Sequence, residues 1–233
     1  MKLTLSPRLL ECSKYVKSGE RIADIGCDHG LLSAYLLTNR IASSAIAADI
    51  NEGPLSSARS NALKFHISDR ISFHLSDGLC SVPHDFDCMI CAGMGAETMI
   101  AILKAAPWIE SSAYHLILQC QTRAHLLRQF LSETGWCIKE ESIVRDGHFL
   151  YTVMDVSRES SNTLTPGQCY LSPALLRHTG PELSEYYARI TAGLRQAVNG
   201  KGRDRVPELA RAYDELTTDP AFYHLKENEY DNC

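Results

Sequence analysis

The chain has 233 residues, of which 45% are hydrophobic and 22% are charged, and its formal net charge is −5. This length suits one full domain with a modest extension. The acidic balance disfavours broad non-specific binding to nucleic acids, although it leaves room for a local basic surface. No run of 18 apolar residues occurs, so no transmembrane helix and no membrane partner are expected.

The first segment, up to Val16, predicts an amphipathic helix rather than a signal peptide, because charged residues interrupt it. Ser6 is expected as its N-cap and Pro7 as its first helical residue. Nine cysteines are scattered along the chain, and Cys88 and Cys91 form a C-x-x-C pair inside an apolar run. Residues three apart in a strand point to opposite faces, so this pair is poorly placed to chelate a metal or form a disulfide. We expect reduced thiols, no bound metal and a cytoplasmic protein.

Short apolar runs alternate with helical patterns from Arg21 to Val156. Strands are expected at residues 21–26, 45–50, 71–75, 87–93, 114–119, 137–144 and 149–156, and helices at 30–39, 53–66, 96–106 and 123–135. This alternation predicts an α/β fold with a parallel, doubly wound sheet covered by helices on both faces. The last two strands are separated only by a short loop, which predicts an antiparallel hairpin closing a seven-stranded sheet.

Polar turn-forming residues at 157–168 mark a predicted boundary between a domain at 1–160 and an extension at 161–233. In the extension, residues 182–198 repeat apolar side chains at helical spacing, and a second helix is expected from Pro207. The sequence Asn-Gly-Lys-Gly at 199–202 is expected to end the first helix and form the turn to the second. The two helices then form a helical hairpin. The polar tail after Asp219 is expected to fray.

A glycine-rich turn follows the first strand as Gly26-Cys27-Asp28-His29-Gly30. In dinucleotide-binding folds a glycine occupies the place of Asp28, because the backbone must approach a pyrophosphate. A carboxylate there repels a pyrophosphate, which disfavours a dehydrogenase, and suits a positively charged ligand without phosphate. S-adenosylmethionine fits this description. The alternative is that Asp28 merely caps the helix that begins near Gly30.

Three more acids lie at the ends of successive predicted strands, and the carboxyl ends of parallel strands meet in one crevice. Asp49 is placed to bind the ribose hydroxyls, Asp77 to accept from the adenine amino group, and Asp24 to orient the turn or contact the methionine end. Asp49 and Asp77 could instead be ordinary turn residues. Small residues after the fourth strand leave room for a flat substrate, although Gly95 could be a turn glycine alone. The absence of an N/D-P-P-Y/F motif counts against methylation of exocyclic amines and leaves attack by a ring nitrogen open.

The motifs D-I-G-C-D-H-G, A-A-D-I, S-D-G-L and D-C-M-I-C-A-G-M-G-A-E together resemble the bacterial tRNA (adenine(22)-N(1))-methyltransferase family. L-I-L-Q and the later G-W-C-I-K-E-E add to the resemblance, which extends from Leu9 through the helical hairpin. It implies a Rossmann-like class I methyltransferase with a C-terminal α-helical extension, which uses S-adenosylmethionine to methylate N1 of an adenine in the tRNA D-loop. The chain has Ala96 where the family usually has glycine, and Gln119-Cys120-Gln121 where it usually has L-Q-P-N, which is expected to alter the loop that shapes the substrate pocket.

The expected cofactor-binding residues gather at the ends of the first four strands: Asp24, Gly26, Cys27, Asp28, Asp49, Ile50, Asp77, Gly78, Ala92 and Gly93. Asp28 is also the expected catalytic residue, because a carboxylate near the base stabilises the positive charge that develops on it. His29 is expected to assist, or alternatively to be a hydrogen-bonded histidine of the turn. Met94 and Gly95 are expected beside the substrate base, which must be unpaired or flipped out.

Basic residues cluster around the predicted hairpin turn and are expected to contact tRNA phosphates: Arg195, Lys201, Arg203, Arg205 and Arg211. The alternative is a solvated helical face. Arg123 and Arg128 are secondary candidates near the ligand edge of the sheet. Two other functions stay open, a small-molecule methyltransferase of the same fold and a non-catalytic RNA-binding protein on a methyltransferase scaffold. A monomer is favoured.

Overall fold

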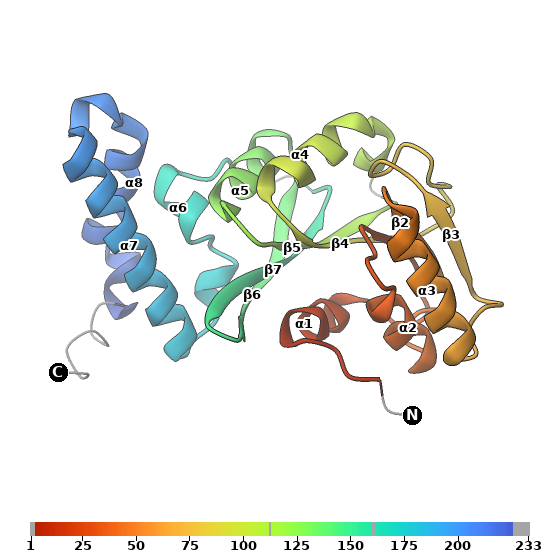
Figure 1. Cartoon of the computed structure of the whole chain (residues 1–233). Helices are drawn as coiled ribbons and strands as arrows, with labels where there is room; N and C mark the ends of the chain where they lie inside the picture. Colours follow the sequence, from red (N-terminus) through yellow and green to blue (C-terminus); the bar gives the residue numbers. More distant parts are fainter. Residues whose placement is uncertain (1–2, 112, 160–161, 226–233) are drawn as a thin grey trace.

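A computed structural model describes residues 3–111, 113–159 and 162–225, and it shows a seven-stranded sheet between two layers of helices (Figure 1). The strands are β1 (Arg21–Ile25), β2 (Ser44–Asp49), β3 (Ile71–Leu75), β4 (Cys88–Met94), β5 (His115–Cys120), β6 (Cys137–Asp146) and β7 (Phe149–Ser157). Their order is β3-β2-β1-β4-β5-β7-β6, in which β1 to β5 are parallel and β7 runs antiparallel to both β5 and β6. The predicted fold class and the closing hairpin are confirmed.

Helices pack on both faces of this sheet, as the alternating pattern predicts. The helices are α1 (Pro7–Tyr15), α2 (Leu31–Thr38), α3 (Glu52–Lys64), α4 (Ala96–Ala105) and α5 (Ala124–Glu133), with a short 3-10 helix, η1 (Pro107–Glu110), after α4. One apolar cluster joins α4 and α5 to the sheet, and a second joins α1, α2 and α3 to its other face. Because the central parallel strands are covered on both sides, they are mostly apolar, and β4 has no charged residue.

Cys88 and Cys91 of β4 belong to different apolar clusters, so the two thiols point to opposite faces of the sheet as predicted. All eight cysteines in the described part of the chain are free thiols. Burial raises the pKa of Cys91 to about 12 and that of Cys120 to about 11, which keeps both protonated and unreactive near neutral pH.

The N-terminal helix begins at Pro7, as predicted, but its expected side-chain cap does not form. Ser6 occupies the N-cap position with extended backbone angles, yet its hydroxyl is buried and has no hydrogen-bond partner among the described residues. The proline at the first helical position has no amide, so the first turn of the helix has one unpaired donor fewer.

The C-terminal segment adds α6 (Pro166–Tyr170), η2 (Leu175–Arg177), α7 (Pro181–Lys201), η3 (Arg203–Arg205), α8 (Pro207–Thr218) and η4 (Pro220–Leu225). The predicted helical hairpin is α7 and α8, which lie at one end of the molecule (Figure 1). These elements share a third apolar cluster of their own, against which Ile143 of β6 packs. The short α6 and η2 are additions that the polar composition of the segment did not predict.

Two details of the hairpin differ from expectation. Helix α7 continues through Asn199 and Gly200 to Lys201, and it stops before Gly202, where φ is +82°. A single glycine destabilises a helix by about 1 kcal/mol relative to alanine, which is too little to end a long packed helix. The tail after Asp219 does not fray at once, because Phe222 and Leu225 of η4 are buried against α7 and α8; the rest of the tail lies outside the described residues.

Arg128 of α5 is completely buried, which corrects its assignment as a candidate tRNA contact. Its Nη2 lies 2.7 Å from Oε1 of Glu141, and its Nη1 donates to the carbonyl oxygens of Cys169 and Tyr170 at 3.0 and 3.1 Å. The helical pattern of α5 turns this arginine inward, where a carboxylate neutralises it. No described helix is both long and apolar enough to cross a membrane.

Candidate active site

A pocket of about 300 Å³ opens at the carboxyl edge of the parallel strands. It brings together most of the predicted site: Asp24, Gly26, Cys27, Asp28, His29, Asp49, Ala92, Gly93 and Met94. The remaining lining residues are Arg8 and Leu9 of α1, Leu31 and Leu32 of α2, and Gln121 after β5. The topology produces this convergence, because β2, β1 and β4 are adjacent parallel strands that end at the same edge.

The turn after β1 curls tightly because three of its residues have positive φ: Gly26 at +72°, Asp28 at +52° and Gly30 at +64°. The amides of Gly26 and Cys27 both donate to the carbonyl oxygen of Ala48, which fixes the turn against β2. A Cβ atom added at Gly26 would lie 2.1 Å from Cε of Met94. Glycine at this position therefore allows the turn to approach the end of β4.

Asp28 does not cap helix α2, which was the alternative to a ligand role. The N-cap of α2 is Gly30, and no side chain caps the helix. The Asp28 side chain is 76% exposed, and its Oδ1 lies 3.5 Å from Nε2 of His29. The His29 carbonyl accepts a hydrogen bond from Nδ2 of Asn61 at 2.9 Å, which ties the turn to α3. The Asp28 carboxylate is thus free to face a ligand in the pocket.

Asp49 is held in one orientation by two backbone amides. Its Oδ2 accepts from the N–H of Asp28 at 3.3 Å, and its Oδ1 accepts from the N–H of Asn51 at 3.0 Å. Each carboxylate oxygen can accept a further hydrogen bond. Two oxygens fixed in this way at the end of β2 suit the two neighbouring hydroxyls of a ribose.

Asp24 is the most buried of the three aspartates that line the pocket, with 4% of its surface exposed. Burial, together with the charges of Asp49 and Asp28, raises its pKa to about 6, although a hydrogen bond from Oγ of Ser33 at 2.7 Å opposes the shift. A buried carboxylate with a raised pKa gains stability when a cation binds beside it.

Four predicted cofactor or substrate residues border this edge without lining the pocket: Ile50, Asp77, Gly78 and Gly95. Asp77 is exposed, and the amide of its neighbour Ser76 donates to the carbonyl of Asp49 at 2.9 Å. Ile50 is 61% exposed directly after β2. Asp77 and Ile50 therefore lie beside the Asp49 end of the pocket, and their contacts with a nucleoside stay predictions.

The two departures from the family pattern lie next to each other at this edge. The amide of Gln121 donates to the Met94 carbonyl at 2.8 Å, and the amide of Ala96 donates to the Thr122 carbonyl at 3.2 Å. These bonds join the loop after β5 to the end of β4. The Gln121 side chain lines the pocket, so this loop supplies an amide to the site.

Arg8 and Leu9 are two lining residues that the motifs did not predict. They precede β1, and no strand-end or turn motif marks them. Helix α1 carries them to the pocket by packing beside β4, β5, β6 and β7. The only sign of Arg8 in the sequence is a charged residue within an apolar helical pattern. The same pattern occurs when a charged residue faces solvent, so it does not indicate a binding site.

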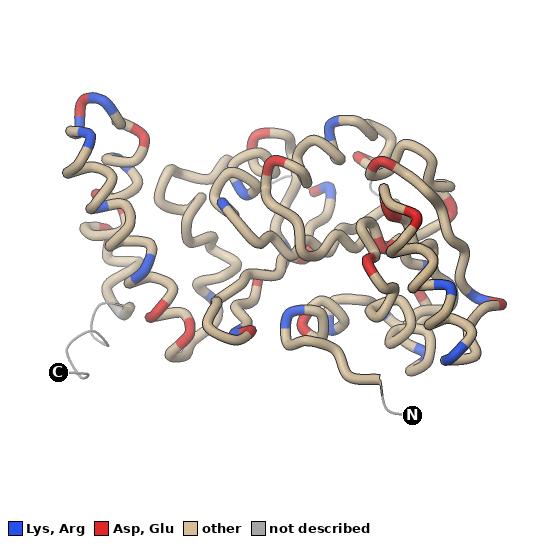
Figure 2. The backbone as a smooth tube through the Cα atoms, viewed as in Figure 1, with Lys and Arg blue, Asp and Glu red and all other residues tan. Residues whose placement is uncertain are grey.

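None of the described basic residues of the extension lines this pocket. Arg195, Lys201, Arg203, Arg205 and Arg211 are all exposed on the α7–α8 hairpin. Figure 2 shows lysine and arginine at the turn of this hairpin, at the opposite end of the molecule from α2 and α3. Arg203 pairs with Asp214 and Arg211 with Glu208. Arg123 is exposed at the start of α5 and pairs with Glu97.

A cluster of Glu20, Cys88 and His115 lies at the other edge of the sheet, where the parallel strands begin, and its ligand atoms are close enough to hold a metal ion. The His115 ring bridges two carboxylates, with Nδ1 3.0 Å from Oδ1 of Asp155 and Nε2 2.9 Å from Oε1 of Glu20. Burial lowers the pKa of His115, but these two carboxylates outweigh burial and raise it overall. The cluster forms a charged link between strands, remote from the pocket.

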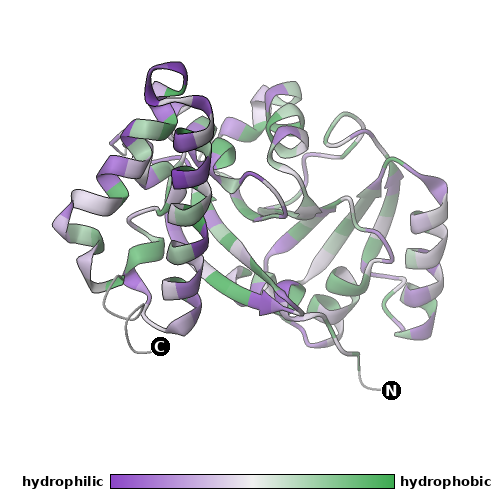
Figure 3. Cartoon of the chain, turned by 60° about the vertical axis from the view of Figure 1, so that its left-hand side comes forward, coloured by the Kyte–Doolittle hydropathy of each residue, from purple (hydrophilic) through white to green (hydrophobic). Residues whose placement is uncertain are grey.

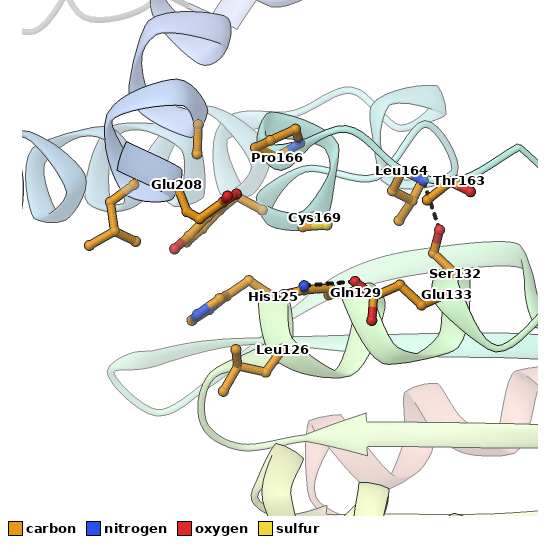
Figure 4. A pocket seen from close by; sticks show the side chains of 13 residues that line it. His125, Leu126, Gln129, Ser132, Glu133, Thr163, Leu164, Pro166, Cys169 and Glu208 are labelled. Atoms are coloured by element: carbon orange, nitrogen blue, oxygen red, sulfur yellow. Dashed lines mark hydrogen bonds between the residues drawn. The ribbon is translucent and has the colours of Figure 1, made fainter. Parts of the chain in front are cut away.

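A second pocket of about 290 Å³ lies between α5 and the C-terminal helices α6 and α8 (Figure 4). The ring of His125 stacks on Tyr170 with centroids 4.5 Å apart and ring planes 10° from parallel. Burial lowers the pKa of His125, as do the charges of Arg128 and Arg123, so this ring is neutral near pH 7. No predicted site residue lines this pocket.

A parallel sheet closed by an antiparallel hairpin, with a glycine-rich turn after β1 and an acid ending β2, defines a class I methyltransferase. Residues 5–154 match a family model described as a methyltransferase domain. The tRNA (adenine(22)-N(1))-methyltransferase of Bacillus subtilis is 33% identical over 154 residues, which are 66% of this chain and 65% of that protein. The chain therefore matches just under two thirds of the length of that relative.

Solved structures extend the likeness to nearly the whole chain. The crystal structure of the B. subtilis m1A22 tRNA methyltransferase is 26% identical, covers 97% of this chain and 99% of its own, and has a TM-score of 0.79. A putative tRNA (m1A22) methyltransferase of Streptococcus pneumoniae, solved with S-adenosyl-L-methionine, is 25% identical, covers 90% and 100%, and has a TM-score of 0.80. The chain belongs to the bacterial tRNA (adenine(22)-N(1))-methyltransferase family, which confirms the resemblance of its motifs.

Proposed function

We propose that this chain transfers a methyl group from S-adenosylmethionine to N1 of adenine 22 in tRNA, the reaction named for its relative. The observation that carries the proposal is the pocket at the carboxyl edge of the sheet, where Asp24, Asp28 and Asp49 converge. The free thiols of the described residues support a location in the cytoplasm, where tRNA is available.

The residues of the pocket fit S-adenosylmethionine. This molecule carries a sulfonium and an ammonium and has no phosphate, so three carboxylates attract it rather than repel it. The fixed oxygens of Asp49 would accept from the ribose hydroxyls, and buried Asp24 would pair with the ammonium. Gly26 leaves the turn without a side chain, which lets its backbone approach a ligand closely.

When bound, S-adenosylmethionine supplies an electrophilic methyl group to the adenine ring nitrogen. That nitrogen has a lone pair and needs no base, so the chain has mainly to position the two reactants. The methylated base is a cation, and the exposed carboxylate of Asp28 would stabilise the positive charge as it develops. N1 lies on the Watson–Crick edge, so the target adenine must leave any base pair before it reacts.

The C-terminal elements supply a separate surface for the RNA. In this proposal residues 1–160 form the methyltransferase domain, residues 161–233 form the extension, and the enzyme acts as a monomer. The exposed arginines and lysine of the α7–α8 hairpin would contact phosphates of the tRNA. Helix α7 and the pocket then contact the same RNA at two places.

The experiment incubates the protein with S-adenosylmethionine carrying a trideuterated methyl group and an unmodified tRNA transcript. Digestion to nucleosides and mass spectrometry should reveal labelled 1-methyladenosine. Reverse transcription should stop at position 22, because a methyl group on N1 blocks base pairing. A transcript with guanosine at position 22 is the matched control and should gain no label. Labelled 1-methyladenosine at another position would refute the proposed target, and no labelled nucleoside at all would refute the proposed substrate.

A further inference from the structure

Arg8 is a pocket residue for which neither the motifs nor the family comparison supplies a role. It lies one residue after the start of α1, and its guanidinium reaches the end of the sheet, where its side chain is 26% exposed. Its Nη1 donates to Oε1 of Gln119 at 3.3 Å, and its Nε lies 3.6 Å from Oδ2 of Asp146. These two contacts occupy only part of the five N–H donors of a guanidinium.

The charges around the pocket give Arg8 a distinct chemistry. Among the described residues that line the pocket it is the only lysine or arginine, and it faces three aspartates. S-adenosylmethionine has one negative group, the carboxylate of its methionine moiety, which those aspartates repel. A ligand bound in this pocket therefore needs a cation for that carboxylate, and an arginine offers it paired, parallel donors.

The strand order places Arg8 where this carboxylate is expected. Asp49 ends β2, Asp24 lies near the end of β1, and the next strand in the sheet is β4. A ligand with its ribose at Asp49 and its ammonium at Asp24 extends toward β4. There, a Cβ atom added at Gly93 would lie 3.2 Å from Nη1 of Arg8, so the guanidinium covers the end of that strand. The carboxylate and the ammonium share one carbon atom, so their partners must be neighbours.

We infer that Arg8 binds the carboxylate of the methionine moiety of S-adenosylmethionine. The inference rests on the proposed function, since it concerns the same pocket and cofactor. Gln119 and Asp146 hold the guanidinium at the end of β4, and helix α1 thereby becomes one wall of the cofactor site. The residue acts in binding and takes no part in the transfer itself.

The test compares two ligands that differ only in this carboxylate, S-adenosylmethionine and decarboxylated S-adenosylmethionine, by titration calorimetry. Arg8→Met should weaken binding of S-adenosylmethionine by about tenfold or more, the size of a charge-assisted hydrogen bond. The decarboxylated ligand has no partner for Arg8, so its affinity should stay the same or increase as a repelling cation is removed. Arg8→Lys, which keeps the charge, should recover part of the lost affinity.

Two control variants separate ligand binding from structural support. Lys14→Met removes an exposed cation from the same helix and should leave both affinities unchanged. Asp146→Asn removes the ion-pair partner of Arg8 but keeps the arginine, so S-adenosylmethionine should still bind more tightly than the decarboxylated ligand. If Asp146→Asn and Arg8→Met each weaken both ligands equally, Arg8 acts by anchoring the β6–β7 hairpin and the inference is overturned.

The remaining outcomes are equally distinct. An equal loss for both ligands in Arg8→Met overturns the inference and leaves the proposed function standing, because the unchanged protein still binds its cofactor. Should the unchanged protein bind neither ligand, the proposed function fails and the inference fails with it. Circular dichroism of each variant checks that the fold is retained, and Arg8→Lys carries the comparison if Arg8→Met is unfolded.

Discussion

The carboxyl group of Asp24 is buried next to Ser33, and burial raises its pKa to about 6. Below that pH the group is neutral in the free protein and no longer attracts an ammonium. A bound cation favours the ionised carboxylate and lowers this pKa, so binding releases a proton at pH values between the two pKa values. Cofactor binding and the protonation of Asp24 are therefore linked.

We predict that the affinity for S-adenosylmethionine falls as the pH drops below about 6, by up to about tenfold per pH unit, since one proton is displaced. Calorimetric titration between about pH 5 and pH 8 measures this slope. Asp24→Asn should bind more weakly at the upper end of that range and show a flat profile. The exposed acid Asp69 lies before β3, and Asp69→Asn should keep the original profile. If affinity changes with pH equally in Asp24→Asn and in the unchanged protein, the proton released on binding comes from another group.

The raised pKa of Asp24 also makes the stability of the cofactor-free protein depend on pH. Its contribution to stability falls as the pH rises, whereas cofactor affinity increases. The folded-state pKa of Asp24 lies above the unfolded value of 3.8, so the folded state binds the proton more tightly. This contribution to stability is present below pH 3.8 and is lost as the pH rises through about 6. At neutral pH the ionised Asp24 destabilises the free fold, and a bound cation relieves that cost.

Asp28 differs from Asp24 because its side chain is mostly exposed and no helix uses it as a cap. We predict that Asp28→Asn lowers the single-turnover rate of tRNA methylation by roughly 10²-fold, the usual effect of removing one electrostatic contact to a transition state. S-adenosylmethionine binding should weaken less, since Asp24 and Asp49 remain. His29→Gln is the matched change in the same turn and should have a smaller effect. Undiminished turnover in Asp28→Asn would exclude this carboxylate from the chemistry.

Among the elements, α5 and β6 share a buried ion pair whose two residues also hydrogen-bond to the C-terminal segment. Arg128 and Glu141 are both inaccessible to solvent, and Ser172 donates to Oε2 of Glu141 at 2.5 Å. Arg128 also holds two carbonyl groups at the end of α6. These contacts join α5, β6 and the segment around α6, so the extension is anchored where it meets the sheet.

We predict that Arg128→Met destabilises the protein by about 3–5 kcal/mol, because Glu141 is left as a buried charge without an opposite charge beside it. Urea denaturation measures this change. The double variant Arg128→Met with Glu141→Leu should be more stable than the single variant, since no lone charge remains. If the two variants are equally unstable, lost contacts to the α6 carbonyls account for the effect and the ion pair does not.

The sequence predicts the elements of the sheet well because their signals are local. A central strand such as β4 is apolar along its length, and a helix such as α5 repeats apolar residues every three or four positions. The burial of a charged residue, by contrast, depends on residues that are distant in the sequence. Arg128 looks like a surface arginine within α5, and only the distant carboxylate of Glu141 allows it to be buried.

The same distinction explains what could be predicted of the site. Asp24, Asp28 and Asp49 belong to strand ends or to the turn after β1, so their convergence follows from the rule that parallel strands share a ligand edge. Arg8 comes from a helix that precedes the sheet, and its approach depends on how α1 packs beside β4 to β7. The continuation of α7 through Gly200 likewise depends on packing, which the helix-breaking residues at 199–202 do not reveal.

At the scale of the molecule, the α7–α8 hairpin lies at the opposite end from α2 and α3 (Figures 1 and 2), and none of its residues lines the acidic pocket. Figure 3 shows hydrophilic residues gathered at the turn between the two long C-terminal helices. The pocket suits a small cation and the turn suits a polyanion, although the net charge of the chain is −5. A substrate that engages both must reach from the pocket to the hairpin, which a folded tRNA can do and a small metabolite cannot.

We predict that reversing Arg203 and Arg205 to glutamate weakens tRNA binding by about tenfold or more at about 100 mM salt and reduces the salt dependence, since about two phosphate contacts are lost. Filter binding at several salt concentrations measures both quantities, and S-adenosylmethionine affinity should be unchanged. The control reverses Lys64 and Lys104, which are exposed on α3 and α4 and give the same change in net charge. An equal loss in both variants would mean that overall charge, and not the hairpin, governs tRNA binding. Unchanged binding after reversal of the two arginines would place the docking surface elsewhere.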